Sequence, residues 1–229
     1  QKLSIHVKAM EAHPSCDVVL GNNVQYDLRS GEPDFGPKDE KKLLETAEYR
    51  SLGDTLSLMG GNLLNGLYRR VVCCSAGPIN EELLRMEDVE YNIRMSVAVS
   101  AIRTIDASLL AYGRYGSDHL TDVKNQAEGV SRGLASAKAM EKTVNSLRVP
   151  TDANIRHTIG NFYLGAAQQA MVTESPSAVE EGFRGALRNR SGLMFHTKVQ
   201  GLRLARSLIG DQKTHILWRW ITNMDSQKK

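Results

Sequence analysis

The fold class is decided by residues 150–210, which read PTDANIRHTIGNFYLGAAQQAMVTESPSAVEEGFRGALRNRSGLMFHTKVQGLRLARSLIG. Pro150 cannot continue a preceding helix, because proline lacks the backbone donor that a helix interior needs. Thr151 or Asp152 can cap the helix that follows, which we expect to run to about Val172. The apolar and small residues of this stretch recur at helical spacing, so the stretch indicates packed helices.

Two further helices follow from the same stretch, and one more lies beyond it. Ser177 and Glu180 form a capping box, which predicts the start of a helix. The next helix covers residues 192–209 and ends at Gly210, in the position where glycine closes helices. A last helix is expected over residues 214–224.

Upstream, helical spacing begins near Asp39 and continues toward the middle of the chain. A long helix is predicted over residues 81–111, a break at residues 112–116, and another helix that ends near residue 147. We therefore expect an all-α fold: a single helical domain of about seven helices over residues 38–229.

The N-terminal residues follow a different pattern. Leu3, Ile5, Val7 and Ala9 alternate with polar residues, which predicts a short strand or an extended arm. A short hairpin over residues 18–28 is a further expectation, since two apolar runs there flank a Gly-Asn-Asn turn. Two glycines and two prolines in residues 29–38 predict a linker, so residues 1–37 are assigned to an extended arm and linker.

The composition is that of a globular protein, with 41% hydrophobic and 24% charged residues, which excludes disorder and collagen. No apolar run approaches the length that crosses a bilayer, so no integral membrane protein is expected. The net charge of +3 is unevenly distributed. Residues 1–100 carry −4, residues 101–183 carry −1, and residues 184–229 carry ten basic groups against two acidic ones, a net charge of +8. We call residues 184–229 the basic segment.

No catalytic or metal-binding motif is present. The six histidines are scattered, and none of the three cysteines belongs to a CxxC pair, so the sequence predicts no metal site, no cofactor and no enzyme activity. The acidic cluster of Glu87, Asp88 and Glu90 is interpreted as a solvated helix face. The glycines at 60–61 and 160–165 lack the context of a phosphate loop and are interpreted as sites of close helix packing. The cysteine pattern favours a reducing intracellular compartment, the cytoplasm.

The basic segment supplies most of the candidate site. Its helix over residues 192–209 is predicted to have a core side with Leu193, Met194, Leu204, Ala205 and Leu208, and a cationic side opposite. Arginine and lysine on such a surface neutralise backbone phosphates, while apolar side chains support sugars and bases. The candidate nucleic-acid-binding residues of the basic segment are Arg184, Arg188, Arg190, Lys198, Arg203 and Arg206.

Residues 112–116, YGRYG, add three candidates of a second kind. Tyr112 and Tyr115 could stack on unpaired bases while Arg114 meets a phosphate. The alternative is a plain helix joint in which the tyrosine rings lie in the core and keep their hydroxyls wet.

These patterns favour a nucleic-acid-binding structural protein, with a viral nucleoprotein or capsid subunit as the concrete form. It would coat single-stranded RNA through the basic segment and self-assemble, and it would then be found in the virion. The first alternative is an all-α matrix or scaffold protein that binds proteins or an anionic membrane surface. The second is a helix-turn-helix DNA-binding regulator. A further alternative is that the basic segment pairs with the acidic first hundred residues within the fold or between subunits.

Overall fold

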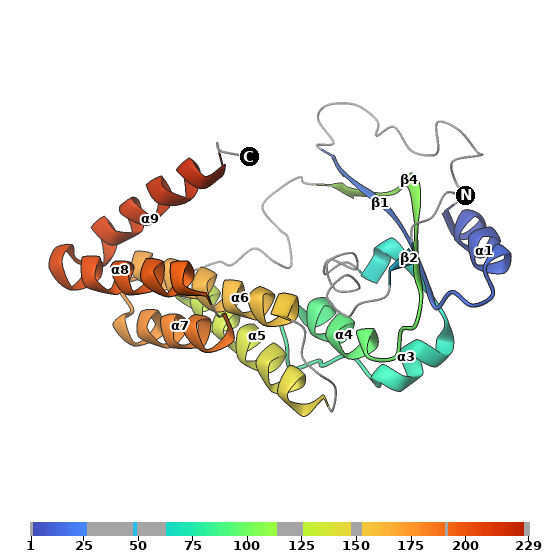
Figure 1. Ribbon diagram of the computed structural model, residues 1–229, viewed down its shortest axis with the longest axis horizontal. Helices are drawn as coiled ribbons and strands as arrows, with labels where there is room; N and C mark the ends of the chain where they lie inside the picture. The colour runs from blue at the N-terminus through green and yellow to red at the C-terminus, as the bar shows by residue number, and fades with distance from the viewer. Residues whose placement is uncertain are drawn as a thin grey trace. The chain divides into compact units, whose positions relative to one another are not determined.

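The computed structural model describes residues 2–26, 48–49, 63–113, 126–147, 153–190 and 192–226 (Figure 1). These residues are mostly helical, which confirms the predicted fold class. The chain divides into two compact units, each described here by itself. The first unit holds the N-terminal elements and the last turn of one long helix, and the second holds the remaining helices. The predicted boundary at residues 37–38 lies outside the described residues, as does most of the helical pattern predicted from Asp39 onward. Residues 48–49 and 66–68 of that stretch are strands, so the helical prediction is wrong there.

The first unit is built on a four-stranded sheet in the order β2-β4-β1-β3. Its central pair, β1 (Val18–Tyr26) and β4 (Ile102–Gly113), is parallel. The edge strands β3 (Gly66–Tyr68) and β2 (Glu48–Tyr49) are antiparallel to β1 and β4, respectively. A short 3₁₀ turn, η2 (Leu63–Asn65), leads into β3.

Helices cover both faces of this sheet. Val18, Leu20 and Ile102 lie in one apolar cluster with residues of α3 (Arg70–Ala76) and α4 (Glu87–Ser96). Val19, Ile105 and Leu109 lie in a second cluster with Ala9 of α1 (Lys2–Ala12), on the opposite face (Figure 1). The run Val18-Val19-Leu20 is therefore apolar throughout, as expected of a strand buried on both faces.

The prediction of a strand at the N-terminus is wrong, because residues 2–12 form helix α1. The alternating residues include a helical pair as well: Ile5 and Ala9 are four apart and pack toward the sheet. Leu3 and Val7, the other members of the alternation, are exposed. The predicted hairpin is also wrong, since residues 18–26 form one continuous strand.

The predicted helix over residues 81–111 is half wrong. Its middle forms α4, but from Ile102 the chain is strand β4. Ile102, Ile105 and Leu109 are spaced by three and four residues, which imitates a helix. In the strand, Ile102 and Ile105 are three apart and face opposite sides of the sheet, while Ile105 and Leu109 are four apart and face the same side.

The parallel pair of strands is fixed at its start by Asp17. The Oδ2 atom of Asp17 accepts hydrogen bonds from the backbone N–H groups of Ser100, at 2.6 Å, and Ala101, at 3.3 Å. We expect Asp17→Ala to lower the free energy of unfolding by about 1 kcal/mol, since two backbone donors lose their partner. Urea denaturation followed by circular dichroism measures this loss. Asp17→Asn keeps one acceptor oxygen and should lose less; equal stability of the alanine variant and the wild type would contradict the assignment.

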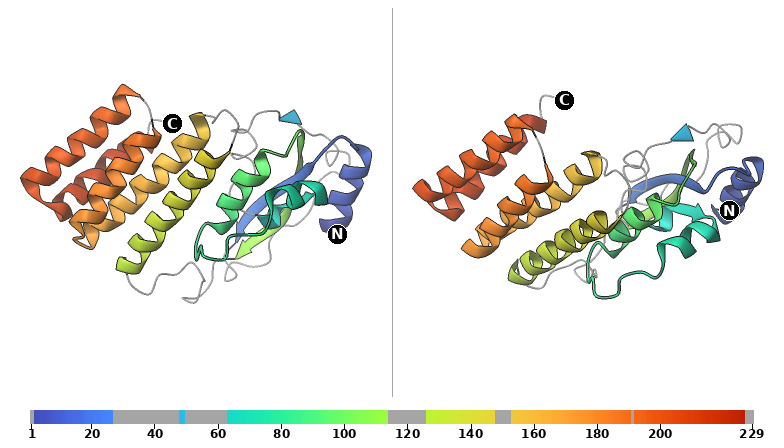
Figure 2. Two further views of the ribbon diagram at one scale, coloured as in Figure 1. Left: turned by 90° about the horizontal axis from the view of Figure 1, so that it is seen from below. Right: turned by 60° about the horizontal axis from the view of Figure 1, so that its bottom comes forward.

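The second unit consists of helices that lie side by side (Figure 2). They are α5 (Gln126–Ser146, in this unit up to Lys142), α6 (Ala153–Val172), α7 (Pro176–Asn189), α8 (Leu193–Ile209) and α9 (Asp211–Ser226). The closure of α8 by Gly210 is confirmed, and this glycine has a φ of 80°, where glycine is favoured. The capping box is not formed: α7 begins at Pro176, after Ser175.

Small residues allow α6 and α7 to approach closely. A Cβ on Gly182 would lie 2.7 Å from the Cβ of Ala167, and a Cβ on Gly160 would lie 3.0 Å from the Cβ of Arg190. The interpretation of Gly160 as a packing residue is therefore confirmed. Gly165 has no atom within 4 Å of such a Cβ, so the same interpretation is wrong for Gly165.

Candidate nucleic-acid interface

Arg184 and Arg203, from two different helices, share one carboxylate. Nε of Arg184 donates to Oε1 of Glu180 at 2.9 Å, and Arg203 donates to both oxygens of the same group. Burial by itself raises the pKa of Glu180, but the hydrogen bonds from Arg203 and Arg184 outweigh it and lower that pKa. The side chain of Arg184 is 71% exposed and that of Arg203 is 31% exposed. Arg184 thus presents its guanidinium to solvent, whereas Arg203 joins α8 to α7.

Arg188 lies one turn after Arg184 and binds Glu141 of α5. Its Nε and one terminal nitrogen each donate to Glu141 at 2.7 Å. The hydroxyl of Tyr163 and the Nδ2 atom of Asn189 donate to the same carboxylate, also at 2.7 Å. The hydrogen bonds from Arg188, aided by those from Tyr163 and Asn189, lower the pKa of Glu141 to about 2. This carboxylate joins three helices, yet the Arg188 side chain remains 58% exposed.

Two cations of α8, Arg206 and Lys198, are less exposed than the sequence predicts. Arg206 contacts Asp211, the first residue of α9, across the joint at Gly210. Lys198 is half-buried. Both belong to the part of α8 that turns toward the other helices rather than to an open cationic face.

The predicted core side of α8 is wrong. Phe195, Val199 and Leu202 are buried, while Leu204 and Leu208 are 62% and 75% exposed. The helix carries two apolar stripes, and each satisfies helical spacing. The basic residues flank the buried stripe, because a long arginine side chain can lie along apolar surface and bring its charged end to a carboxylate.

Arg190 differs from the other arginines of the basic segment. One terminal nitrogen donates to Oδ1 of Asn161 on α6 at 2.8 Å, and the guanidinium carbon lies 4.1 Å from the ring centroid of Phe195. Both partners are neutral. Among the described residues, Arg190 has no carboxylate partner, and burial lowers its pKa.

The candidates at residues 112–116 are described only in part. Tyr112 lies in strand β4, where its backbone pairs with Gln25 of β1, so its assignment to a helix joint is wrong. Arg114 and Tyr115 lie outside the described residues.

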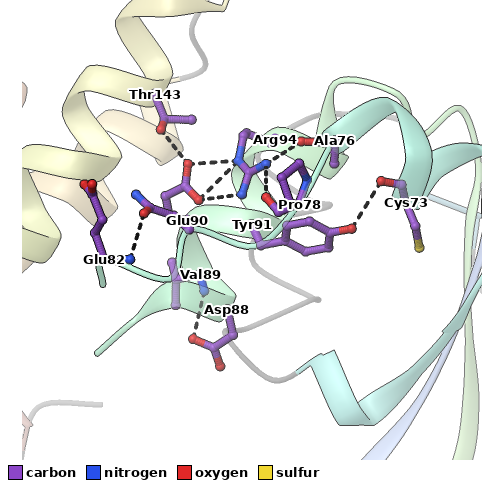
Figure 3. Close-up of polar contacts among 11 residues, drawn as sticks. Cys73, Ala76, Pro78, Glu82, Asp88, Val89, Glu90, Tyr91, Arg94 and Thr143 are labelled. Atoms are coloured by element: carbon purple, nitrogen blue, oxygen red, sulfur yellow. Dashed lines mark hydrogen bonds and ion pairs between the residues drawn. The ribbon is translucent and has the colours of Figure 1, made fainter. Parts of the chain in front are cut away.

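The acidic cluster on α4 is not a simple solvated face. Glu90 is buried and binds Arg94, which in turn donates to the carbonyl oxygens of Ala76 and Pro78 (Figure 3). The hydroxyl of Thr143 donates to Glu90 at 2.6 Å. The interpretation as a solvated face is therefore wrong for Glu90. Its contacts connect α4 with the end of α3 and with the last turn of α5.

The counter-ions of the basic segment are the functional neighbours that the sequence pattern missed. For Arg184, Arg188, Arg203 and Arg206 in the described part of the chain, they include Glu180, Glu141 and Asp211. The four-residue spacing of Glu180 and Arg184 is a signal that could have identified one pair. Glu141 is 47 residues away from Arg188, and no local pattern reveals that contact.

The described residues contain no group of three or more His, Cys, Asp and Glu side chains placed to hold a metal ion. None of the helices in the described ranges is long and apolar enough to cross a bilayer. Cys16, Cys73 and Cys74 are free thiols.

The sequence matches no protein family model, and no curated protein is similar to it. What the chain does is therefore inferred from its own residues.

Proposed function

We propose that the protein is a structural protein that coats single-stranded RNA, as a viral nucleoprotein or capsid subunit does. The observation that carries the proposal is the pair of exposed arginines on α7, Arg184 and Arg188, one turn apart within a segment of net charge +8. Such cations bind phosphates without regard to base sequence, as a coat requires.

The ion pairs of these arginines do not cancel their charge. Glu180 is shared by Arg184 and Arg203, so one carboxylate faces two cations. The exposed ion pair of Arg184 contributes roughly 0–1 kcal/mol in water, so a phosphate can compete for this guanidinium at little cost, whereas Arg188 is held more firmly by Glu141. The basic segment therefore retains positive charge at the surface of α7.

The test is the salt dependence of RNA binding. We expect fluorescence anisotropy with labelled oligo(U) to show affinity that falls steeply between 50 and 200 mM salt, because bound cations release counterions. Arg184→Gln should reduce the logarithmic salt slope by about 0.7, the share of one single-strand phosphate contact.

Lys138→Gln is the matched control. Lys138 is also an exposed cation paired with a glutamate of α7, Glu181, but it lies outside the basic segment. The logarithmic salt slope of oligo(U) binding by the Lys138→Gln variant should equal that of the wild type. Absence of oligo(U) binding at low salt, or an equal loss of slope in both variants, would count against the proposal. Electron microscopy of the purified protein with RNA tests assembly, which should give filaments or shells.

A protein scaffold that binds partner proteins is the second candidate, favoured by one specific observation. Four aliphatic side chains on α8 and α9 are exposed: Leu204, Leu208, Ile209 and Ile216. Exposed apolar groups of this kind are typical of protein contacts. Analytical ultracentrifugation separates the two functions: RNA-independent association that Leu208→Ser removes would favour the scaffold.

A further inference from the structure

The outward face of α6 is polar and free of acidic residues. Its exposed positions recur at helical spacing, while Ile155, Ile159 and Tyr163 point to the core. No Asp or Glu occurs between residues 153 and 172. We call five of the exposed positions the α6 ridge; they are Asn154, His157, Asn161, Gly165 and Gln169.

Arg190 is placed against this ridge by three contacts. Asn161 accepts a hydrogen bond from its guanidinium, and the ring of Phe195 lies beneath the guanidinium plane. Gly160 lets the backbone at Arg190 approach α6, since a Cβ there would lie 3.0 Å from the Cβ of Arg190. A planar guanidinium fixed on one face and at one nitrogen keeps further N–H groups for an anion.

The electrostatic environment of the ridge favours an anion. His157 lies one turn before Asn161, and its pKa is lowered first by burial and second by the positive charge of Arg190. Two groups that can carry positive charge thus lie near each other, and the partner given to Arg190 is a neutral amide. An anion placed at the ridge would pair with Arg190 and favour the charged form of His157.

We infer that the α6 ridge, with Arg190, His157 and Asn161 at its centre, is a binding site for the phosphodiester backbone of single-stranded RNA. This inference rests on the proposed function and gives it a specific surface. Arg190 meets the phosphate as a fixed cation, and the side chains of His157 and Asn161 supply hydrogen bonds. Gln169 extends the amide surface along the same face, and Gly165 leaves room there for a close approach of the strand.

The decisive variant is Asn161→Asp. It places a carboxylate beside Arg190, which neutralises the guanidinium and repels phosphate while it keeps the size and the acceptor oxygen of the side chain. We expect labelled oligo(U) to bind the full chain about 10-fold more weakly, with a salt slope reduced by about 1. The thermal midpoint should be unchanged or higher, since an ion pair replaces a neutral hydrogen bond.

Gln200→Glu is the matched control. Gln200 is exposed on α8, and its Oε1 atom lies 3.5 Å from a terminal nitrogen of Arg203, so the same change of charge is made beside another arginine. We expect oligo(U) affinity to remain within twofold of the wild type. If Gln200→Glu weakens binding and Asn161→Asp does not, RNA binds at α8: the ridge is wrong and the proposed function stands. If the wild type does not bind oligo(U) at 50 mM salt, both the ridge and the proposed function are wrong. The same conclusion follows if the protein sediments with phosphatidylserine vesicles but does not bind oligo(U).

Discussion

Replacing Gly185 by alanine is expected to destabilise the second unit by about 2 kcal/mol, even though alanine is the better helix former by about 1 kcal/mol. A Cβ on Gly185 would overlap the ring of Tyr163, at 2.5 Å from Cε1. The ring cannot move aside, because Tyr163 is buried and its hydroxyl is held by Glu141. Helices α6 and α7 must therefore separate, and the thermal midpoint should fall by about 4–8 °C.

Gly201→Ala is the control for this prediction. Gly201 lies in the interior of α8, and a Cβ there meets no atom within 4 Å. The substitution should stabilise the protein by about 0.5–1 kcal/mol, the propensity difference alone. Differential scanning calorimetry of both variants checks the two signs. A Gly185→Ala variant as stable as the wild type would show that α6 and α7 do not pack through this glycine.

The helices of the second unit could be predicted from the sequence because local signals mark their ends. Gly210 closes α8 with a positive φ, as its position predicts. The pattern of buried residues also agrees with the predicted helices. α6 buries residues at three- and four-residue spacing, so the apolar pattern of its sequence matches the side of the helix that is buried.

The elements of the first unit could not be predicted in this way, because the signals there are ambiguous. The residues of α1 satisfy both a two-residue and a four-residue period, and only the sheet beneath Ile5 and Ala9 selects the helix. Ile102, Ile105 and Leu109 satisfy helical spacing although they belong to β4. Because helices cover both faces of the sheet, apolar residues of β4 occur on both sides of the strand, and the strand then lacks the simple alternation that would distinguish it from a helix.

The positive charge of the candidate site could be predicted from the sequence, but the contacts of its side chains could not. The net charge of the basic segment follows from counting, and the exposure of Arg184 agrees with its place on an amphipathic helix. Which stripe of α8 faces the core depends on the neighbouring helices, so Leu204 and Leu208 were assigned to the wrong side. The partner of Arg188 depends on the contact of α7 with α5, across 47 residues of sequence.

Replacing Glu141 by glutamine is expected to destabilise the second unit by about 3 kcal/mol. All partners of this carboxylate are donors: Arg188, Tyr163 and Asn189. A glutamine side chain removes the charge and turns an NH₂ group toward at least one of these donors. Guanidinium denaturation measures the loss. Glu181→Gln is the control, because Glu181 pairs with the exposed Lys138 and its loss should change stability by less than about 1 kcal/mol.

The same carboxylate predicts a dependence of stability on pH. Because the folded protein holds the pKa of Glu141 at about 2, below its ordinary 4.5, the group stabilises the fold fully above pH 4.5. This contribution, about 2 kcal/mol once the exposure of Arg188 is allowed for, is lost as the pH falls from 4.5 toward 2. In Glu141→Gln the loss should be absent, so the stability curves of wild type and variant should converge in acid. Curves that stay parallel from pH 6 to pH 2.5 would mean that the carboxylate titrates alike in the folded and unfolded chain, and that its four hydrogen bonds do not favour the ionised form.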